Sequence, residues 1–330
     1  MNILRYLSHR RQKNSNFLYY LENCLSYAMP DFLFRRRLAA ELLKLADYDK
    51  DYIAGRVNYY NKLDAISGLA ENAVRVGDFR LPRKKAYSGE KLAAHVYFFD
   101  AYEHTRFFPA DNRIALLFGD ITHIPAYPSI VKSRPVEGDN KNSVVLKLEK
   151  LRHFMFVKDG KQFRDKKNLL LGRCAVYQPW RVKFWEMYFG HPLCDLGQVN
   201  KIPAFNKDWI VPHMTIDEHL EYKFILALEG NDVASNLKWI MSSNSLAVMP
   251  KPTYETWFME GTLIPDYHYV EIKKDYSDLP EKLEYYIKNT EEALNIIDNA
   301  HRYVAQFKDE QREKLISLLV LKKYFEYVEQ

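Results

Sequence analysis

Apolar residues recur at three- and four-residue spacing near the start of the chain, over residues 17–27 and 31–48. This spacing places apolar side chains on one face of a helix, so it predicts two helices, interrupted at Pro30. Asp31 follows that proline and is expected to cap the second helix. The chain is therefore expected to begin with helical structure.

Further along, five short continuous apolar runs bounded by turn residues predict buried parallel strands. These runs span 114–118, 169–171, 224–228, 245–249 and 268–272. Helical spacing is found between and after them, in 233–241, 255–259, 279–287, 291–307 and 312–328. An alternation of strand, turn and helix indicates an α/β fold with parallel sheets.

The length of 330 residues suits two domains. The segments most like linkers are 137–142, which is polar, and 159–168, which is charged. We place the boundary near the second segment, which gives domains 1–160 and 161–330.

Composition and charge exclude some classes of protein. Apolar residues make up 47% of the chain and charged residues 28%, so it can bury a core and is not disordered. The net charge of +5 gives no sign of a nucleic-acid-binding protein. The basic residues cluster in 9–11 (His-Arg-Arg) and 35–37 (Arg-Arg-Arg). Such clusters form either a solvated face or a surface that is attracted to an anionic membrane.

Three cysteines, Cys24, Cys174 and Cys194, show no CxxC or metal-type spacing. An odd number without such spacing argues against a disulfide scaffold and a zinc site, and it fits a reducing cytosol. The first residues lack the pattern of a signal peptide, and no apolar run approaches the ~20 residues that cross a bilayer. We therefore expect a cytoplasmic protein that at most lies on a membrane.

Candidate chemistry lies at the ends of the predicted strands, where open α/β sheets bind ligands. Asp120 follows the first strand directly and is either a turn aspartate or a general base. Residues 230–235 lead from a strand into a helix and form a generic anion site, which is a weak signal. Arg173 and Arg181 either bind phosphate or are ordinary surface arginines.

Several well-known motifs are absent from the chain. It lacks GxGxxG and a Walker loop, which disfavours an NAD enzyme and a P-loop NTPase, and it lacks HExxH and GxSxG. Residues 47–49 spell a DxD motif but follow a helical run, and the cluster Asp217-Glu218-His219 fits a solvated loop better than a metal site. No metal site is expected.

Four motifs follow one another in the C-terminal third, and four shorter ones lie upstream. The first set is 228–238 (LEGNDVASNLK), 245–248 (SLAV), 254–258 (YETWF) and 265–270 (PDYHYV). The second set is 119–122 (GDIT), 132–135 (KSRP), 152–154 (RHF) and 172–173 (GR). This ordered series resembles glycosyltransferase family 90 over residues 114–325. That family holds eukaryotic protein O-glucosyltransferases and O-xylosyltransferases, fungal capsule-associated proteins and bacterial lipopolysaccharide-core transferases, and the upstream set resembles the bacterial branch.

The resemblance implies a GT-B fold, with two Rossmann-like domains facing across a cleft and the final helix crossing back. It also implies inverting transfer from a UDP-sugar, without a cofactor or an obligatory metal. Asp120 matches the position of the family's general base, so the resemblance favours the catalytic interpretation of this residue.

Other residues resemble the family's UDP-binding positions. Arg173 matches an arginine that contacts the diphosphate, although Cys174 stands where glycine is usual. Asn236 stands where eukaryotic members have arginine, so Lys238 or Arg181 can substitute for that phosphate ligand. The loop residues that resemble the family's diphosphate-binding loop are Gly230, Asn231, Ala234 and Ser235. Glu255 is expected to bind the ribose hydroxyls.

The resemblance implies a bacterial transferase of lipopolysaccharide or lipooligosaccharide core assembly. It would use UDP-glucose or UDP-galactose and a lipid-anchored core acceptor at the inner membrane. Two alternatives remain open, namely transfer to a protein hydroxyl and a non-catalytic protein that binds nucleotide or carbohydrate. The residues expected to contact the acceptor are Lys132, Arg134, Arg152 and His153.

Overall fold

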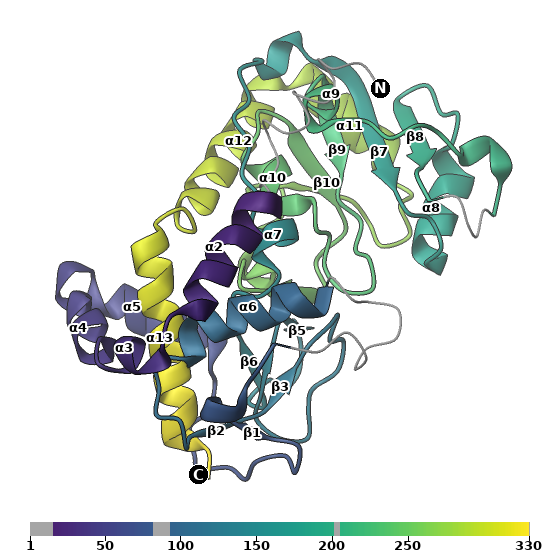
Figure 1. The fold of residues 1–330 in the computed structure, drawn as a ribbon. Helices are drawn as coiled ribbons and strands as arrows, with labels where there is room; N and C mark the ends of the chain where they lie inside the picture. Colours follow the sequence, from purple (N-terminus) through teal and green to yellow (C-terminus); the bar gives the residue numbers. More distant parts are fainter. Residues whose placement is uncertain (1–15, 82–92, 201–204, 330) are drawn as a thin grey trace. The chain divides into compact units, whose positions relative to one another are not determined.

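A computed structural model describes residues 16–81, 93–200 and 205–329 of the chain (Figure 1). The chain divides into two compact units. Among the described residues, unit 1 comprises His153–Pro252 and Thr262–Gln306. Of the same described residues, unit 2 comprises those within 16–152, Thr253–Gly261 and 307–329. The expected boundary near residue 160 lies close to the crossing between Arg152 and His153. The return of the last helix to unit 2 corresponds to the helix that the resemblance expects to cross back, whereas the return at Thr253–Gly261 was not expected from the sequence.

Unit 1 contains a five-stranded sheet whose neighbouring strands are all parallel, in the order β12-β10-β9-β7-β8 (Figure 1). Counted along the chain, this order is five, four, three, one, two, which is a doubly wound arrangement with its reversal between β7 and β9. The α/β class with parallel sheets is thus confirmed. The strands are β7 (Lys167–Cys174), β8 (Cys194–Gln198), β9 (Tyr222–Leu226), β10 (Leu246–Met249) and β12 (Val270–Glu271).

Four of the predicted apolar runs coincide with β7, β9, β10 and β12. Strand β8 was not predicted, because this edge strand contains Asp195 and Gly197 and has no continuous apolar run. A strand with a neighbour on one side only needs less apolar surface than a central strand.

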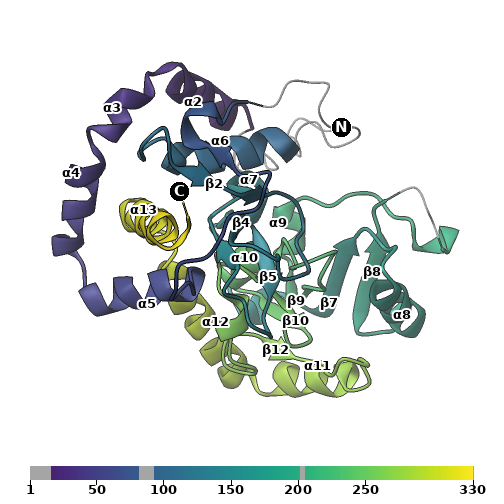
Figure 2. The same ribbon diagram turned by 90° about the horizontal axis from the view of Figure 1, so that it is seen from below.

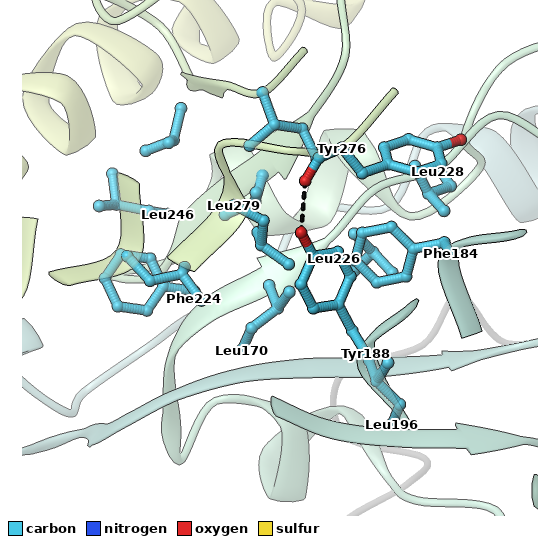
Figure 3. Packing of buried hydrophobic residues seen from close by; sticks show 14 of the residues in the cluster. Leu170, Phe184, Tyr188, Leu196, Phe224, Leu226, Leu228, Leu246, Tyr276 and Leu279 are labelled. Carbon is cyan, nitrogen blue, oxygen red and sulfur yellow. Dashed lines mark hydrogen bonds between the residues drawn. The ribbon is translucent and has the colours of Figure 1, made fainter. Parts of the chain in front are cut away.

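The sheet of unit 1 packs against helices through a large buried apolar cluster. Figure 3 shows Leu170 and Phe224 of the sheet together with Phe184 and Tyr188, and the Tyr188 hydroxyl donates to the Tyr276 carbonyl at 2.5 Å. The helices of unit 1 are α8 (Pro179–Tyr188), α9 (Ile216–His219), α10 (Leu237–Met241), α11 (Leu279–Lys288) and α12 (Thr290–Ala305).

Unit 2 is built mainly from helices. Helices α2 to α5 form an arc around α13, the last helix of the chain (Figure 2). The helices of unit 2 are α2 (Asn16–Ala28), α3 (Asp31–Arg35), α4 (Leu38–Leu43), α5 (Lys50–Tyr60), α6 (Ala93–Thr105), α7 (Lys150–His153) and α13 (Glu310–Tyr327). The last residue of α7, His153, is the first residue of the following unit 1 segment.

Three small sheets complete unit 2. Strands β3 (Leu116–Leu117), β4 (Ser129–Val131) and β6 (Ser143–Val145) form a parallel sheet. Two antiparallel pairs are formed by β1 (Val74–Arg75) with β2 (Arg113–Ile114), and by β5 (Ser133–Pro135) with β11 (Tyr254–Thr256). The 3₁₀ turns of the described chain are Lys44–Asp47, Val76–Asp78, Phe163–Asp165, Lys207–Trp209 and Glu260–Thr262.

A polar core explains why residues 253–261 belong to unit 2. The Arg56 guanidinium lies 3.1 Å from a carboxylate oxygen of Glu313, and both side chains are buried. The Tyr60 ring stacks on Trp257 with centroids 3.8 Å apart, and the Trp257 indole donates to Glu313 at 2.5 Å. These contacts tie α5, α13 and the returning segment together.

Five predicted local features are wrong. The helix predicted over 31–48 is divided into α3, α4 and a 3₁₀ turn, and the strand predicted over 114–118 is divided between β2 and β3. The helix predicted over 255–259 is absent, because residues 254–256 form strand β11 and pair with β5. The helix predicted over 233–241 begins only at Leu237, after a turn. Asp31 is the first residue of α3 rather than its cap, and its carboxylate binds Tyr102 and Arg106 instead.

The DxD motif has a structural use. Asp49 caps α5, since its carboxylate accepts the backbone N–H groups of Asp51 and Tyr52 at 2.9 and 3.0 Å. No cluster of three or more His, Cys, Asp or Glu side chains that could hold a metal ion occurs in the described part of the chain. No helix in the same part is both long and apolar enough to span a bilayer. The basic cluster at 9–11 lies outside the described residues.

Candidate functional site

Asp120 lies just beyond the carboxyl end of β3, at a turn that only glycine adopts easily. Gly119 has a φ of +112°, a backbone conformation that other residues avoid. The next residue is also fixed, because the Ile121 N–H donates to the Ser133 hydroxyl and that hydroxyl donates back to the Ile121 carbonyl, both at 3.1 Å. The main chain on both sides of Asp120 is therefore held in place.

The carboxylate of Asp120 is anchored on a buried lysine. Lys132 Nζ donates to Asp120 Oδ1 at 2.5 Å. The lysine side chain is 1% exposed, whereas the aspartate side chain is 28% exposed. The ammonium group thus orients a carboxylate that remains accessible from solvent, which is the geometry that a general base needs.

A second carboxylate continues this network. Lys132 Nζ lies 3.5 Å from Glu149 Oε2, and Glu149 accepts from the Tyr97 hydroxyl at 3.1 Å. Arg152 Nε lies 2.8 Å from the other Glu149 oxygen, and the arginine side chain is 57% exposed. Positive and negative groups therefore alternate from Asp120 through Lys132 and Glu149 to Arg152, so the buried charges are compensated. Glu149 and Tyr97 were not predicted from the sequence.

Arg134 and Glu255, which were expected to bind different ligands, bind each other in unit 2. Arg134 Nε lies 2.8 Å from Glu255 Oε1, and these side chains are 0% and 2% exposed. Arg134 also donates to the carbonyls of Tyr59 and Ser143 at 2.7 and 3.1 Å, and the Tyr59 hydroxyl donates to Glu255. In this arrangement neither side chain presents its charge to solvent.

His153, the remaining residue expected to contact the acceptor, is buried at the end of α7. Of the four residues in that set, Arg152 is thus the one with a largely exposed side chain.

In unit 1 the reversal of strand order lies between β7 and β9, and doubly wound sheets bind ligands at the carboxyl ends of the strands beside such a reversal. Two loops begin there, 175–178 after β7 and 227–236 after β9. Arg181 of α8 joins them, because it donates to the carbonyls of Ala175, Leu228 and Glu229 at 2.8–2.9 Å. All three donor nitrogens of Arg181 are used in holding these loops.

The loop 227–236 presents some predicted residues and buries others. Asn231 is exposed and accepts from Gln178 at 3.3 Å, while Gly230 and Ser235 are half-buried. Ala234 and Lys238 are buried. Of the residues predicted to bind the diphosphate here, a ligand can therefore reach Gly230, Asn231 and Ser235.

The Arg173 side chain binds Asp195 of the neighbouring strand β8. Its guanidinium donates to the Asp195 side chain at 2.5 Å and to the Asp195 carbonyl at 2.7 Å. Asp195 lies opposite Leu171, two residues before Arg173. Burial alone would raise the pKa of Asp195, but hydrogen bonds from Tyr222 and Arg173 lower it. This ion pair holds β7 against β8.

Two aromatic side chains that the sequence analysis did not single out lie beside these loops. Tyr177 and Trp180 are both exposed, and the Trp180 indole donates to the Glu229 carbonyl at 3.0 Å. Exposed rings at a ligand-binding edge can stack on a planar base. The sequence feature that could have pointed to these two residues is their position beside Gln178 and Pro179, where α8 begins.

Comparisons with known proteins agree on one family. Residues 155–325 match the model described as glycosyl transferase family 90. The chain is 44% identical to the O-glucosyltransferase LpsA of Dichelobacter nodosus over 277 residues, which cover 84% of each chain. It is also 31% identical to human protein O-glucosyltransferase 3 over 110 residues, 33% of this chain and 21% of the human one. Asp120 and Lys132 lie upstream of the residues that match the family model.

Proposed function

Because this chain belongs to glycosyltransferase family 90, we propose that it transfers glucose from UDP-glucose to a hydroxyl of a lipopolysaccharide or lipooligosaccharide core sugar. The acceptor in this proposal is a heptose or hexose of the lipid-anchored core. Glucose is preferred to galactose because both relatives named above are O-glucosyltransferases. The observation that carries the proposal is the accessible Asp120 carboxylate held by Lys132.

The proposed reaction inverts the configuration at the anomeric carbon. Asp120 accepts the proton of the acceptor hydroxyl while that oxygen forms a bond to the anomeric carbon. The bond from this carbon to the phosphate oxygen breaks on the opposite face, and UDP leaves with the electron pair. Lys132 keeps the Asp120 carboxylate oriented during this step, since its Nζ donates to Oδ1.

The donor in this proposal binds at the carboxyl ends of β7 and β9. Backbone amides near Gly230 and Asn231 and the hydroxyl of Ser235 would contact the diphosphate, and Tyr177 or Trp180 would stack on uracil. Arg181 supports the loops through their carbonyls. Arg173 would reach the diphosphate only after its side chain leaves Asp195.

Two further features belong to the proposal. The first is the GT-B arrangement, in which two units face each other across the donor, and which a structure with bound UDP would test. The second is independence from a metal ion, as the family resemblance implies. Turnover measured with and without EDTA tests it, because a metal-dependent enzyme loses activity in the chelator.

The function is tested by incubating the protein with each of several UDP-sugars and a truncated core oligosaccharide. The proposal expects a product one hexose heavier with UDP-glucose. Asp120→Asn should lower turnover by about 10²–10⁴-fold and keep UDP affinity, since it removes the base and preserves the shape of the side chain. Asp111→Asn, at an exposed position of unit 2, is the matched control and should leave turnover unchanged.

The outcomes separate the alternatives. A heavier product with UDP-galactose alone would correct the donor. Transfer to a serine-containing peptide instead of the oligosaccharide would favour protein O-glucosylation, the activity in the name of the human relative. UDP binding without consumption of any UDP-sugar would show that the protein is a non-catalytic relative.

A further inference from the structure

Helix α2 turns its most apolar side chains away from the unit on which it packs. Phe17, Leu18, Leu21 and Leu25 are 69%, 53%, 44% and 63% exposed, and no residue of α2 is buried. At 3.6 residues per turn these four side chains fall within an arc of roughly 100°. We call this set the leucine arc.

The opposite side of α2 makes the contacts with the rest of unit 2. The Tyr19 hydroxyl donates to Asp100 of α6 at 2.7 Å. The Tyr27 ring packs edge-on against Phe98 and Tyr102, with centroids 5.6 and 5.2 Å away. Surface helices of globular proteins normally place the apolar face inward and the polar face outward. In α2 the tyrosines face inward and the leucine arc faces outward.

Further exposed apolar side chains follow between α2 and α3 and in the next two helices. Met29, Phe32, Leu33 and Leu43 are exposed as well. Eight of the twenty-one exposed large apolar side chains in the described chain therefore lie between residues 17 and 43. Single exposed apolar residues are ordinary, but a concentration of this kind marks an interaction surface.

Positive charge accompanies this surface. Arg36 and Arg37 are exposed, and the Arg36 guanidinium lies 5.3 Å from the centre of the Phe32 ring. Two of the three acidic residues of the stretch are turned inward, because Asp31 binds Arg106 and the buried Glu41 binds Lys44 and Lys314. Glu41 also lies 3.5 Å from the guanidinium of Arg37, whose side chain stays 66% exposed. The third, Glu22, stays exposed beside the leucine arc. The surface therefore combines aliphatic side chains with neighbouring arginines.

We propose that α2, α3 and α4 bind an anionic lipid bilayer. The leucine arc enters the boundary between headgroups and acyl chains, and Arg36 and Arg37 contact lipid phosphates. A second copy of the chain fits less well, because a two-fold interface places the same patch opposite itself and brings the arginines of both copies together. A bilayer supplies both the apolar layer and the negative charge.

Vesicle binding by the full chain tests this inference without any sugar donor or acceptor, so the result does not depend on the proposed function. The parent protein should sediment with vesicles of phosphatidylcholine mixed with phosphatidylglycerol more strongly than with phosphatidylcholine alone. Leu18→Gln, Leu21→Gln and Leu25→Gln together should lower binding at least tenfold on anionic vesicles. Arg36→Gln with Arg37→Gln should lower it about tenfold on anionic vesicles only.

The matched control is a triple variant at exposed apolar positions of unit 1, namely Met187→Gln, Ile210→Gln and Ile264→Gln. Its binding should stay within twofold of the parent, and the melting temperature of each variant shows that it is folded. The inference is wrong if the parent does not bind anionic vesicles, or if both sets of N-terminal substitutions leave binding within twofold. It is also wrong if the parent is a dimer in solution that the leucine substitutions make monomeric.

Discussion

Two basic residues of unit 2, Lys132 and Arg134, stand two positions apart and each binds a carboxylate from another segment of the chain. Arg134 and Glu255 are both buried, and four further groups surround them. Lys132 is buried as well, but its partner Asp120 is 28% exposed. The two pairs are chemically similar and differ mainly in whether the acid can be reached.

This difference separates a structural ion pair from a functional one. A buried pair holds together the elements that supply it, here β5 and β11, and it is costly to break. A pair with one accessible carboxylate can offer that carboxylate to a substrate while the buried partner fixes its direction. The family resemblance gave Asp120 a catalytic role and Lys132, Arg134 and Glu255 ligand-binding roles, because a matching motif does not reveal which side chains are buried.

The largest predicted effect is on stability. Arg134→Met should lower the free energy of unfolding by about 3–5 kcal/mol, because it leaves the Glu255 carboxylate buried without its arginine. Chemical denaturation measures this change. The double variant Arg134→Met with Glu255→Leu should recover part of the loss, and a double variant no more stable than the single one would show that the pair is not the reason.

Unit 2 also contains a buried histidine, His104, whose charge depends on pH. Burial lowers the pKa of His104 from 6.5 to about 4. The unfolded chain therefore takes up a proton at a higher pH than the folded one. The free energy of unfolding keeps this contribution in full above pH 6.5. It falls by about 3 kcal/mol as the pH decreases towards 4.

Unfolding free energies measured from pH 7 to pH 4 in the parent and in His104→Gln test this linkage. The variant should lose less stability over this range than the parent. His213→Gln, at an exposed position of unit 1, is the control and should follow the parent curve. Parallel curves for the parent and His104→Gln would contradict the assignment.

Lys132→Met sharpens the comparison of the two pairs. Stability should fall by only about 1–2 kcal/mol, because Asp120 can turn to water and Glu149 keeps Arg152 and Tyr97. Turnover should fall by roughly ten- to a hundredfold, since the carboxylate is no longer held in one orientation. Steady-state kinetics should show the loss in kcat rather than in the KM for UDP-glucose.

The control for this prediction is Lys141→Met, which breaks an exposed ion pair with Asp64 in the same unit. It should leave melting temperature and turnover unchanged. If Lys132→Met reduces stability and turnover in proportion, so that the remaining folded protein is fully active, Lys132 has only a structural role.

The smallest effect concerns the backbone beside Asp120. Gly119→Ala should lower the free energy of unfolding by about 1 kcal/mol. The positive φ alone is the reason, because an added Cβ meets no atom within 4 Å. The substitution should also reduce turnover by shifting Asp120. Gly55→Ala in α5 also meets no atom within 4 Å, so it should stabilise the helix, by about 1 kcal/mol. Thermal unfolding distinguishes the two, and equal shifts of the same sign would contradict the argument.

Much of the fold was predictable, because parallel strands and amphipathic helices leave a periodic signal. Strands β7, β9, β10 and β12 and helices α11 to α13 follow the apolar pattern closely. The edge strand β8 and the short strand β11 escaped prediction, because both depend on a neighbouring strand rather than on their own composition.

The candidate site was only partly predictable. The position of Asp120 at a strand end followed from the sequence, and so did the loop 227–236. The partners could not be foreseen, because Lys132 with Asp120, Arg134 with Glu255 and Arg173 with Asp195 are long-range or sheet-dependent contacts. Whether a basic residue is available to a ligand depends on which acid the fold brings to it.

The central claim is that the accessible pair serves the chemistry and the buried pair serves the fold. Turnover and melting temperature measured side by side for Asp120→Asn and Glu255→Gln test it most directly. We predict that Asp120→Asn loses about 10²–10⁴-fold in turnover at an unchanged melting temperature. Glu255→Gln should melt at a lower temperature and keep most of its turnover below that temperature. The opposite pattern, with an active Asp120→Asn and a stable but inactive Glu255→Gln, would contradict the account.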